Sequence, residues 1–299
     1  MNLKMMSIVS MCVALALAIS AQVSAMTPDE ALTMLQEGNA RYVAGKSIHP
    51  RQDAGRRAET SDMGQYPQTT ILACSDSRVP VEILFDQGLG DLFVVRVAGN
   101  VADVDEVGTI EYGVEHLHTP LVVVLGHTHC GAVTAVVEGT QVHGNIMLLV
   151  DNIVPAVEKV RAERPDLSGD DLVSATVEAN VWKAIEDLLK SSRATAKLVQ
   201  GGNLKVVGAV YDIETGEVEW LGEHPDQDAL LIAAASSRIV RNAGSEVVQD
   251  DESAIVPETN EAGTSGDSKE EGSGGLLLLA SFLALIGLVF LLKRLVLSD

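Results

Sequence analysis

Basic residues are scarce in this chain of 299 residues. Lysine and arginine total 21, whereas aspartate and glutamate total 42, so the formal net charge is −21 at pH 7. A surface this acidic repels phosphate groups, and the composition therefore argues against nucleic acid or anionic lipid as a partner. The length allows one large domain or two small ones, with enough residues for a hydrophobic core.

Cysteine is rare as well, and only Cys12, Cys74 and Cys130 occur in the whole chain. Cys12 lies in a predicted leader, which leaves two cysteines in the remainder. In an oxidising compartment two cysteines ordinarily pair as a disulfide. That interpretation does not explain why other reactive side chains crowd the same two positions, as described below.

The first 25 residues have the pattern of a signal peptide. Lys4 precedes the apolar run 11–19, and Val23, Ser24 and Ala25 form a small-x-small cleavage pattern. The run is short for a membrane span. We therefore predict a signal peptide over residues 1–25 and an exported protein located in the periplasm or cell envelope. An uncleaved N-terminal anchor is the alternative.

The other end carries a longer apolar run. Leu276 to Leu292 contains no charge and, as a helix, spans roughly 25 Å, which is just enough to cross a bilayer. Lys293 and Arg294 follow and predict a cytoplasmic end. With the glycines just before it, the segment 275–299 resembles bacterial sorting tails that a membrane protease cuts. Permanent anchoring in the membrane is the alternative.

Between these ends the composition changes once. Residues 244–274 are rich in Asp, Glu, Ser, Gly and Thr, with little that could form a core. We predict a disordered acidic linker there and a single folded domain over residues 26–243.

The folded part has the pattern of an α/β protein. Three apolar runs, 69–73, 92–97 and 121–125, are nearly continuous rather than alternating, as in strands buried on both faces. Helical patterns separate them, which predicts a central, mostly parallel sheet flanked by helices. Residues 204–212 and 217–221 are expected to add a C-terminal hairpin to this sheet.

Helices are expected around this sheet at both ends of the domain. Thr27 and Pro28 are typical of a helix start, and residues 41–68 are expected to be irregular. The remaining predicted helices are 79–85, 104–116, one beginning near 131, 146–161, 170–190 and 225–240.

Metal-binding side chains follow two of the predicted strands. Cys74 ends the first, and His127 and Cys130 come directly after the third. Ligands of open parallel sheets bind outside the carboxyl ends of the strands, so these side chains should meet at one edge. Two thiolates and one imidazole suit Zn²⁺, and a zinc with three protein ligands keeps one coordination position open for chemistry.

Asp76 and Arg78 lie two and four residues beyond Cys74. A carboxylate beside zinc could fill the fourth position in a closed state or accept a proton from metal-bound water. A neighbouring arginine could hold that carboxylate through a bidentate pair. An ordinary loop ion pair is the simpler alternative.

With these motifs the chain resembles a bacterial beta-class carbonic anhydrase over roughly residues 28–240. The resemblance is carried by segments that occur in the family's order. They are Gly38-Asn39-x-Arg41-Tyr42, Cys74-Ser75-Asp76-Ser77-Arg78-Val79, Gly90-Asp91-Leu92-Phe93-Val94, Ala98-Gly99-Asn100 and Gly126-His127-Thr128-x-Cys130-Gly131-Ala132.

The resemblance implies roles for particular residues. Zinc would be held by Cys74, His127 and Cys130, with Asp76 and Arg78 as the catalytic dyad. Gln65 would donate a hydrogen bond to bicarbonate, and the backbone near Gly131 would line the site. The family also assembles as homodimers or higher homo-oligomers whose interface helps to enclose the site.

The implied reaction is the reversible hydration of carbon dioxide to bicarbonate and a proton by zinc-bound hydroxide. One alternative is a hydrolase of carbonyl sulfide or carbon disulfide on the same scaffold, because the motifs barely separate these substrates. Another is a non-catalytic zinc or redox protein whose thiols cycle to a disulfide.

Overall fold

The computed structural model describes residues 26–244, and their side chains as far as residue 235. The predicted signal peptide 1–25, the predicted tail 275–299 and all but the first residue of the predicted linker 244–274 lie outside the described residues. Among residues 26–244, no helix combines the length and hydropathy that crossing a membrane requires.

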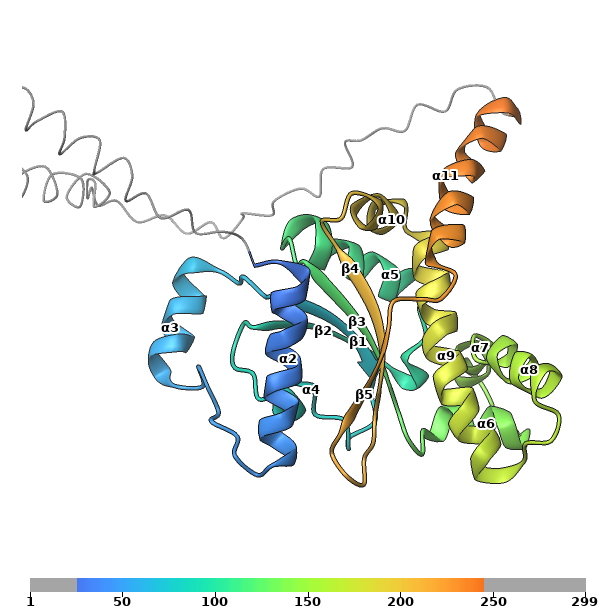
Figure 1. The fold of residues 1–299 in the computed structure, drawn as a ribbon, viewed down its shortest axis with the longest axis horizontal. Coiled ribbons are helices and arrows are strands. Elements are labelled where there is room, and N and C mark those ends of the chain that lie inside the picture. The colour runs from blue at the N-terminus through green and yellow to red at the C-terminus, as the bar shows by residue number, and fades with distance from the viewer. Residues whose placement is uncertain (1–25, 245–299) are drawn as a thin grey trace, which may run out of the picture. The chain divides into compact units, whose positions relative to one another are not determined.

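A five-stranded sheet forms the centre of the described structure, in the order β2-β1-β3-β4-β5 (Figure 1). The first four strands in this order are parallel, and β5 runs antiparallel to β4. The predicted mostly parallel sheet with an appended hairpin is therefore confirmed. The strands are β1 (Thr69–Cys74), β2 (Leu92–Val97), β3 (Leu121–His127), β4 (Lys205–Tyr211) and β5 (Val218–Gly222).

Helices cover both faces of the sheet. On one face α5 and α9 pack against side chains such as Leu72, and on the other α2 packs against Ile71 and Ala73. Successive residues of β1 point to opposite faces, so a strand covered on both sides buries every side chain and is mostly apolar. The helices are α2 (Pro28–Val43), α3 (Ala54–Met63), α4 (Val81–Leu84), η1 (Ala98–Asn100), α5 (Val104–Glu111), η2 (Tyr112–His116), α6 (Gly131–Glu138), α7 (Asn145–Asp151), α8 (Val154–Glu163), α9 (Gly169–Ser191), α10 (Arg193–Gln200) and α11 (Gln227–Gly244).

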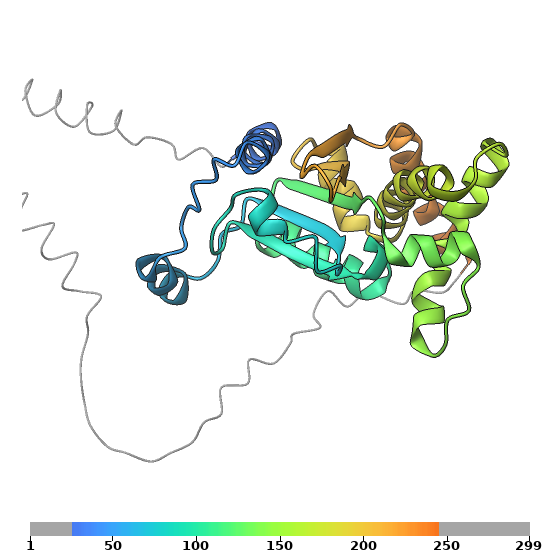
Figure 2. The ribbon, with the colours of Figure 1, turned by 90° about the horizontal axis from the view of Figure 1, so that it is seen from below.

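Helices also mark the two ends of the parallel strands. In Figure 2, α6, α7 and α8 lie beyond the carboxyl end of β3, to which its arrow points. In the same view α3 stands apart from the sheet at the opposite end. The carboxyl edge of the sheet is therefore next to α6 and far from α3.

Two predictions about helices were wrong. The segment 41–68 was expected to be irregular, yet it contains α3, which begins after an N-cap by Asp53 and buries none of its residues. A helix without a buried face has no apolar periodicity that a sequence pattern could detect. The predicted helix 146–161 is split into α7 and α8 because Pro155 lacks an N–H and its ring would clash with the carbonyl of Asp151.

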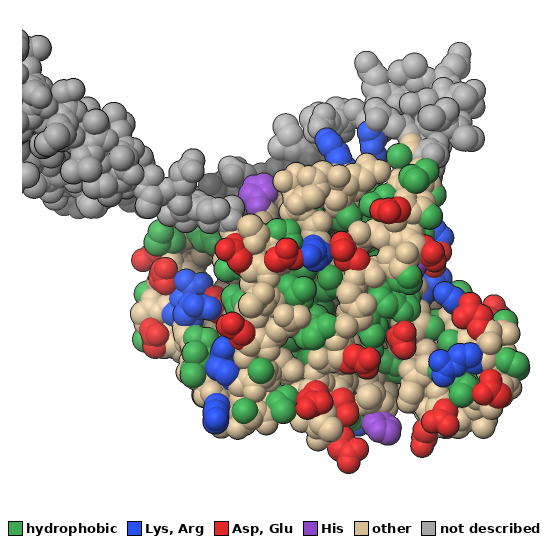
Figure 3. Space-filling view, viewed as in Figure 1, with side chains coloured by type: hydrophobic (Ala, Val, Ile, Leu, Met, Phe, Trp, Pro, Cys, Tyr) green, Lys and Arg blue, Asp and Glu red, His purple; other side chains and the backbone are tan. Residues whose placement is uncertain are grey.

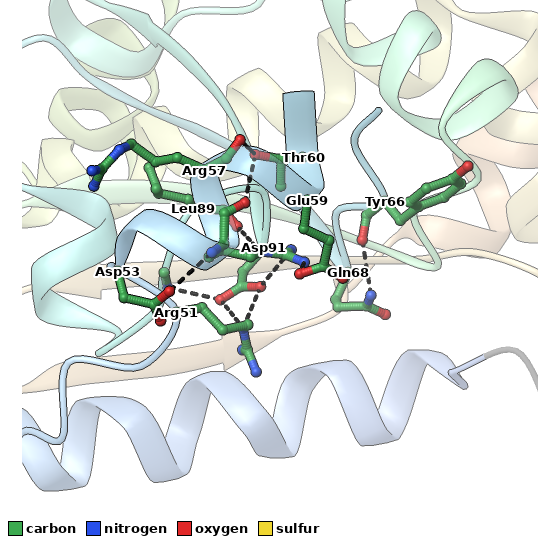
Figure 4. A network of polar contacts seen from close by, with 11 residues as sticks. Arg51, Asp53, Arg57, Glu59, Thr60, Tyr66, Gln68, Leu89 and Asp91 are labelled. Carbon is green, nitrogen blue, oxygen red and sulfur yellow. Dashed lines mark hydrogen bonds and ion pairs between the residues drawn. The ribbon is translucent and has the colours of Figure 1, made fainter. Parts of the chain in front are cut away.

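Acidic side chains are spread over the face of the molecule in Figure 3, but Asp86 and Asp91 are buried. Asp91 accepts hydrogen bonds from Arg51 Nε at 2.7 and 2.8 Å, and Arg56 Nη2 lies 3.7 Å from its Oδ1 (Figure 4). Arg56 also bonds Glu59 on the same helix. This network attaches α3 to the start of β2, although α3 contributes nothing to the core.

Asp86 connects α2 to the loop that follows it. Its carboxylate accepts hydrogen bonds from Arg41 Nε at 2.6 Å, from Ile48 N–H at 3.1 Å and from His49 N–H at 2.9 Å. The side chain is fully buried. Burial would raise the pKa of this carboxyl, but the hydrogen bonds from Arg41, Ile48 and His49 outweigh it and lower the pKa below its ordinary 3.8.

Replacing Asp86 by Asn should lower the free energy of unfolding by roughly 3 kcal/mol at pH 7, because an amide NH₂ would face buried donors. Since the pKa is lowered in the folded state, the carboxylate stabilises the protein above pH 4, and this contribution disappears as the pH falls further. Urea unfolding should therefore show a difference between wild type and Asp86→Asn that shrinks in acid. The control variant Asp29→Asn removes an exposed carboxylate that pairs with Lys205. Its free energy of unfolding should fall by less than about 1 kcal/mol. An equal fall in the free energy of unfolding in both variants would contradict this account of Asp86.

Candidate metal centre

Three candidate zinc ligands meet at the carboxyl edge of the sheet. Cys74 is the last residue of β1, His127 is the last residue of β3, and Cys130 precedes α6. β1 and β3 are parallel neighbours, so their carboxyl ends lie side by side. The two Sγ atoms and a ring nitrogen of His127 all lie within 4.8 Å of one another, and all three residues are buried.

The imidazole of His127 is oriented for metal binding. Its Nδ1 lies 2.9 Å from the carbonyl of Thr128, so Nδ1 carries the proton and donates it. Its Nε2 is buried and has no hydrogen-bond partner among the described residues. A buried, unpartnered nitrogen lone pair is costly unless something binds it. In a tetrahedral site, zinc bond lengths place neighbouring ligand atoms about 3.4–3.8 Å apart. The residues present therefore fit zinc.

The sulfur of Cys74 lies in an environment that favours a thiolate. Backbone N–H groups of Gly99 and Asp76 donate to Sγ at 3.3 and 3.4 Å. Hydrogen bonding by Cys130 contributes most to lowering the pKa of Cys74, and the N–H groups of Gly99 and Asp76 add to it against the effect of burial. The same sharing of a proton with Cys74 raises the pKa of Cys130. Both cysteines are free in the structure, and a divalent cation between the sulfurs would favour both thiolates.

Asp76 and Arg78 form the bidentate pair that the sequence predicts. Arg78 Nε donates to Oδ1 of Asp76 at 3.0 Å, and Nη2 donates to Oδ2 at 2.7 Å. The same Nη2 also donates to the carbonyl of His129 at 3.1 Å. These bonds from Arg78 lower the pKa of Asp76 well below its usual range. Oδ2 lies 4.0 Å from His127 Nε2, so an ionised carboxylate stands beside the three ligands.

The remaining two predicted site residues occupy different places. Gly131 is exposed beside Cys130, and a Cβ built on it would meet no atom within 4 Å. Gln65 is exposed on the segment between α3 and β1. It precedes the amino end of β1, whereas Cys74 is at the carboxyl end, and a six-residue strand is about 20 Å long. The structure therefore does not bring Gln65 to the ligands of its own chain.

Sequence analysis missed two residues that shape the site. Arg96 in β2 donates to the carbonyls of Cys74 and Asp76 at 3.0 and 2.6 Å, and it thereby holds the loop that carries both. The signal in the sequence was Arg96 itself, because a charged residue there interrupts an otherwise apolar run. Gly99 is part of a segment that carries the resemblance, and nothing local indicated that its N–H reaches the sulfur of Cys74.

Comparisons with known proteins agree with this geometry. The family model described as carbonic anhydrase matches residues 69–218. The chain is 42% identical over 193 residues to "Carbonic anhydrase 2" of Mycobacterium tuberculosis, a match that covers 63% of this chain and 90% of the relative.

Solved structures of beta-carbonic anhydrases are also similar to this chain. The beta-carbonic anhydrase CafA of Aspergillus fumigatus aligns with a TM-score of 0.57 and 28% identity over 69% of this chain and 97% of that one. Tetrameric beta-carbonic anhydrases from Sordaria macrospora align with a TM-score of 0.53 and 25% identity, over 64% and 96% of the two chains. The family match includes all three candidate ligands, and the sheet that carries them is shared with these structures. The chain therefore belongs to the carbonic anhydrase family, and within it to the beta class.

Proposed function

We propose that this protein is a zinc enzyme that reversibly hydrates carbon dioxide to bicarbonate and a proton. The observation that carries the proposal is the convergence of Cys74, His127 and Cys130, with the buried Nε2 of His127 left without a hydrogen-bond partner in the described part of the chain. Membership of the carbonic anhydrase family supports the choice of reaction.

Each of the three ligands has a defined part in this proposal. His127 would bind through Nε2, because Nδ1 is engaged by the carbonyl of Thr128. Cys74 and Cys130 would bind as thiolates. Bound zinc would supply Lewis acidity, which lowers the pKa of a water molecule in its open position.

Asp76 is proposed to orient that water and accept its proton. Arg78 holds the carboxylate in one orientation through two hydrogen bonds. Because both oxygens of Asp76 are engaged by Arg78, the arrangement seen here favours this role over Asp76 as a fourth ligand. A closed state with Asp76 on the metal would first have to break the pair.

The proposed reaction is tested by stopped-flow measurement of carbon dioxide hydration, with metal analysis of the same purified sample. We expect about one zinc per chain and hydration well above the buffer rate. Parallel assays with carbonyl sulfide and carbon disulfide check the two hydrolase alternatives. A metal-free protein with Cys74 and Cys130 joined in a disulfide would contradict the proposal and favour the redox alternative.

We further propose that the enzyme works as a homodimer or larger homo-oligomer in which Gln65 acts across the subunit interface. The tetrameric relatives support assembly. Within one chain Gln65 lies at the opposite end of β1 from Cys74. It can therefore donate to bicarbonate only if it comes from a neighbouring copy.

Replacing Gln65 by Ala should leave zinc content unchanged and lower kcat/KM about tenfold, which corresponds to one hydrogen bond. Co-expression with Asp76→Asn then tests the origin of Gln65. A mixed dimer would contain one site with an intact Asp76 and an intact Gln65. We expect the mixture to exceed the activity of either parent variant. A mixture no more active than Gln65→Ala alone would show that Gln65 does not act between subunits.

A further inference from the structure

Asn180 is an unusual residue for its position in α9. Most of the residues that α9 buries are apolar, including Val177, Val181 and Ile185, yet Asn180 is buried among them at 2% exposure. Asparagine is a poor helix former, and burying its amide costs free energy unless it forms hydrogen bonds. Such a residue calls for an explanation in terms of what its side chain binds.

The side chain of Asn180 reaches the loop that follows β2. Its Nδ2 donates to the carbonyl of Gly99 at 2.7 Å, between residues 81 positions apart in the sequence. Glycines on the sheet allow this reach, because a Cβ on Gly126 or Gly208 would lie 2.7 or 2.8 Å from the side chain of Val181. Helix α9 therefore packs directly on β3 and β4.

The backbone conformation of Gly99 links the hydrogen bond at its carbonyl to the direction of its N–H. Its backbone has φ 76° and ψ 15°, a left-handed conformation that suits glycine. A Cβ at this position would lie 2.7 Å from Ile153 Cδ1 and 3.2 Å from Ala132 Cβ. With the carbonyl held by Asn180, the N–H of Gly99 is directed at Sγ of Cys74 at 3.3 Å.

We propose that Asn180 is a positioning residue of the metal centre, acting on the Cys74 sulfur through Gly99. The inference rests on the zinc site proposed above and adds a residue that touches neither metal nor substrate. An N–H directed at a thiolate stabilises its charge and limits its movement, so it favours retention of the metal. Without Asn180 the carbonyl of Gly99 would lose its buried donor, and the N–H would no longer be held toward the sulfur.

Replacing Asn180 by Leu removes the donor while keeping a side chain of similar size. We expect zinc transfer from the loaded protein to a chromogenic chelator to become about tenfold faster, at the low end of the effect of outer-sphere partners on metal affinity. In protein loaded with cobalt(II), the sulfur-to-metal charge-transfer bands should shift. If the Leu variant does not fold, Asn180→Ala removes the same donor and carries the same expectation.

Asn39 provides a matched control. It is also buried, and its Nδ2 donates to the carbonyls of Leu84 and Gly216, away from the ligands. Asn39→Leu should lower the urea midpoint but leave zinc transfer within about twofold of wild type and the cobalt spectrum unchanged. Equal acceleration in both variants would assign the effect to general destabilisation and overturn the role of Asn180.

The two proposals fail in different ways. If zinc-loaded wild type hydrates carbon dioxide while Asn180→Leu and Asn180→Ala match it in zinc transfer and cobalt spectrum, only the inference about Asn180 is overturned. If purified wild type binds no zinc, both the proposed function and this inference are overturned.

Discussion

Replacing His127 by Ala is expected to abolish zinc binding and lower carbon dioxide hydration by at least about 10³-fold. The change leaves two of the three candidate ligands among the described residues, and a tetrahedral catalytic site needs three. Cys74→Ala should have the same effect, since it removes the sulfur that accepts hydrogen bonds from the N–H groups of Gly99 and Asp76. Zinc content of the purified variants and stopped-flow hydration are the measurements.

The best control for this variant lies two residues away. His129 is exposed, and it contributes its carbonyl to Arg78. Its φ of 54° is a conformation that asparagine tolerates, so His129→Asn should keep both zinc and most of the activity. One zinc per chain in His127→Ala, or loss of zinc in His129→Asn, would mean that the second histidine is the ligand.

Replacing Asp76 by Asn is expected to keep zinc bound while lowering kcat by about 10²–10⁴-fold, the contribution typical of a positioned proton acceptor. The amide has nearly the shape of the carboxylate, so the fold should be preserved. It cannot accept both hydrogen bonds from Arg78, and it cannot take up a proton. Zinc analysis separates this result from simple loss of metal.

The pH dependence of the Asp76→Asn variant tests the same role. Hydrogen bonds from Arg78 lower the pKa of Asp76, so in wild type the carboxylate is ionised at every pH above its ordinary value of 3.8. The factor by which Asn reduces kcat should therefore be the same at pH 7 and pH 9. Loss of zinc from Asp76→Asn would identify Asp76 as a structural ligand and contradict the proposed role.

Arg78→Lys complements that experiment. Lysine keeps the positive charge but lacks the planar fork that binds both oxygens of Asp76. We expect zinc to remain bound and kcat to fall by about tenfold, less than in Asp76→Asn, because the carboxylate is present but less well oriented. A fall as large as that of Asp76→Asn would indicate that Arg78 has a role beyond holding the carboxylate.

Several parts of the fold could be predicted because their signals are local. The apolar runs that became β1 and β3 are buried along their whole length, and burial on both faces favours apolar side chains at successive positions. The three candidate zinc ligands could be grouped because parallel strands end at a common edge. Helix α3 gave no such signal, since its attachment depends on Asp91, which lies well beyond it in the chain.

The linear order of residues was enough to predict the parallel sheet, the grouping of Cys74, His127 and Cys130, and the pairing of Asp76 with Arg78, because each depends on burial pattern or on neighbours in the chain. The predicted signal peptide, linker and tail remain predictions. Folding alone decided that Arg96 braces the Cys74 loop and that Asn180 reaches Gly99. These relations join residues far apart in sequence through hydrogen bonds and close packing, which no local pattern of side chains encodes.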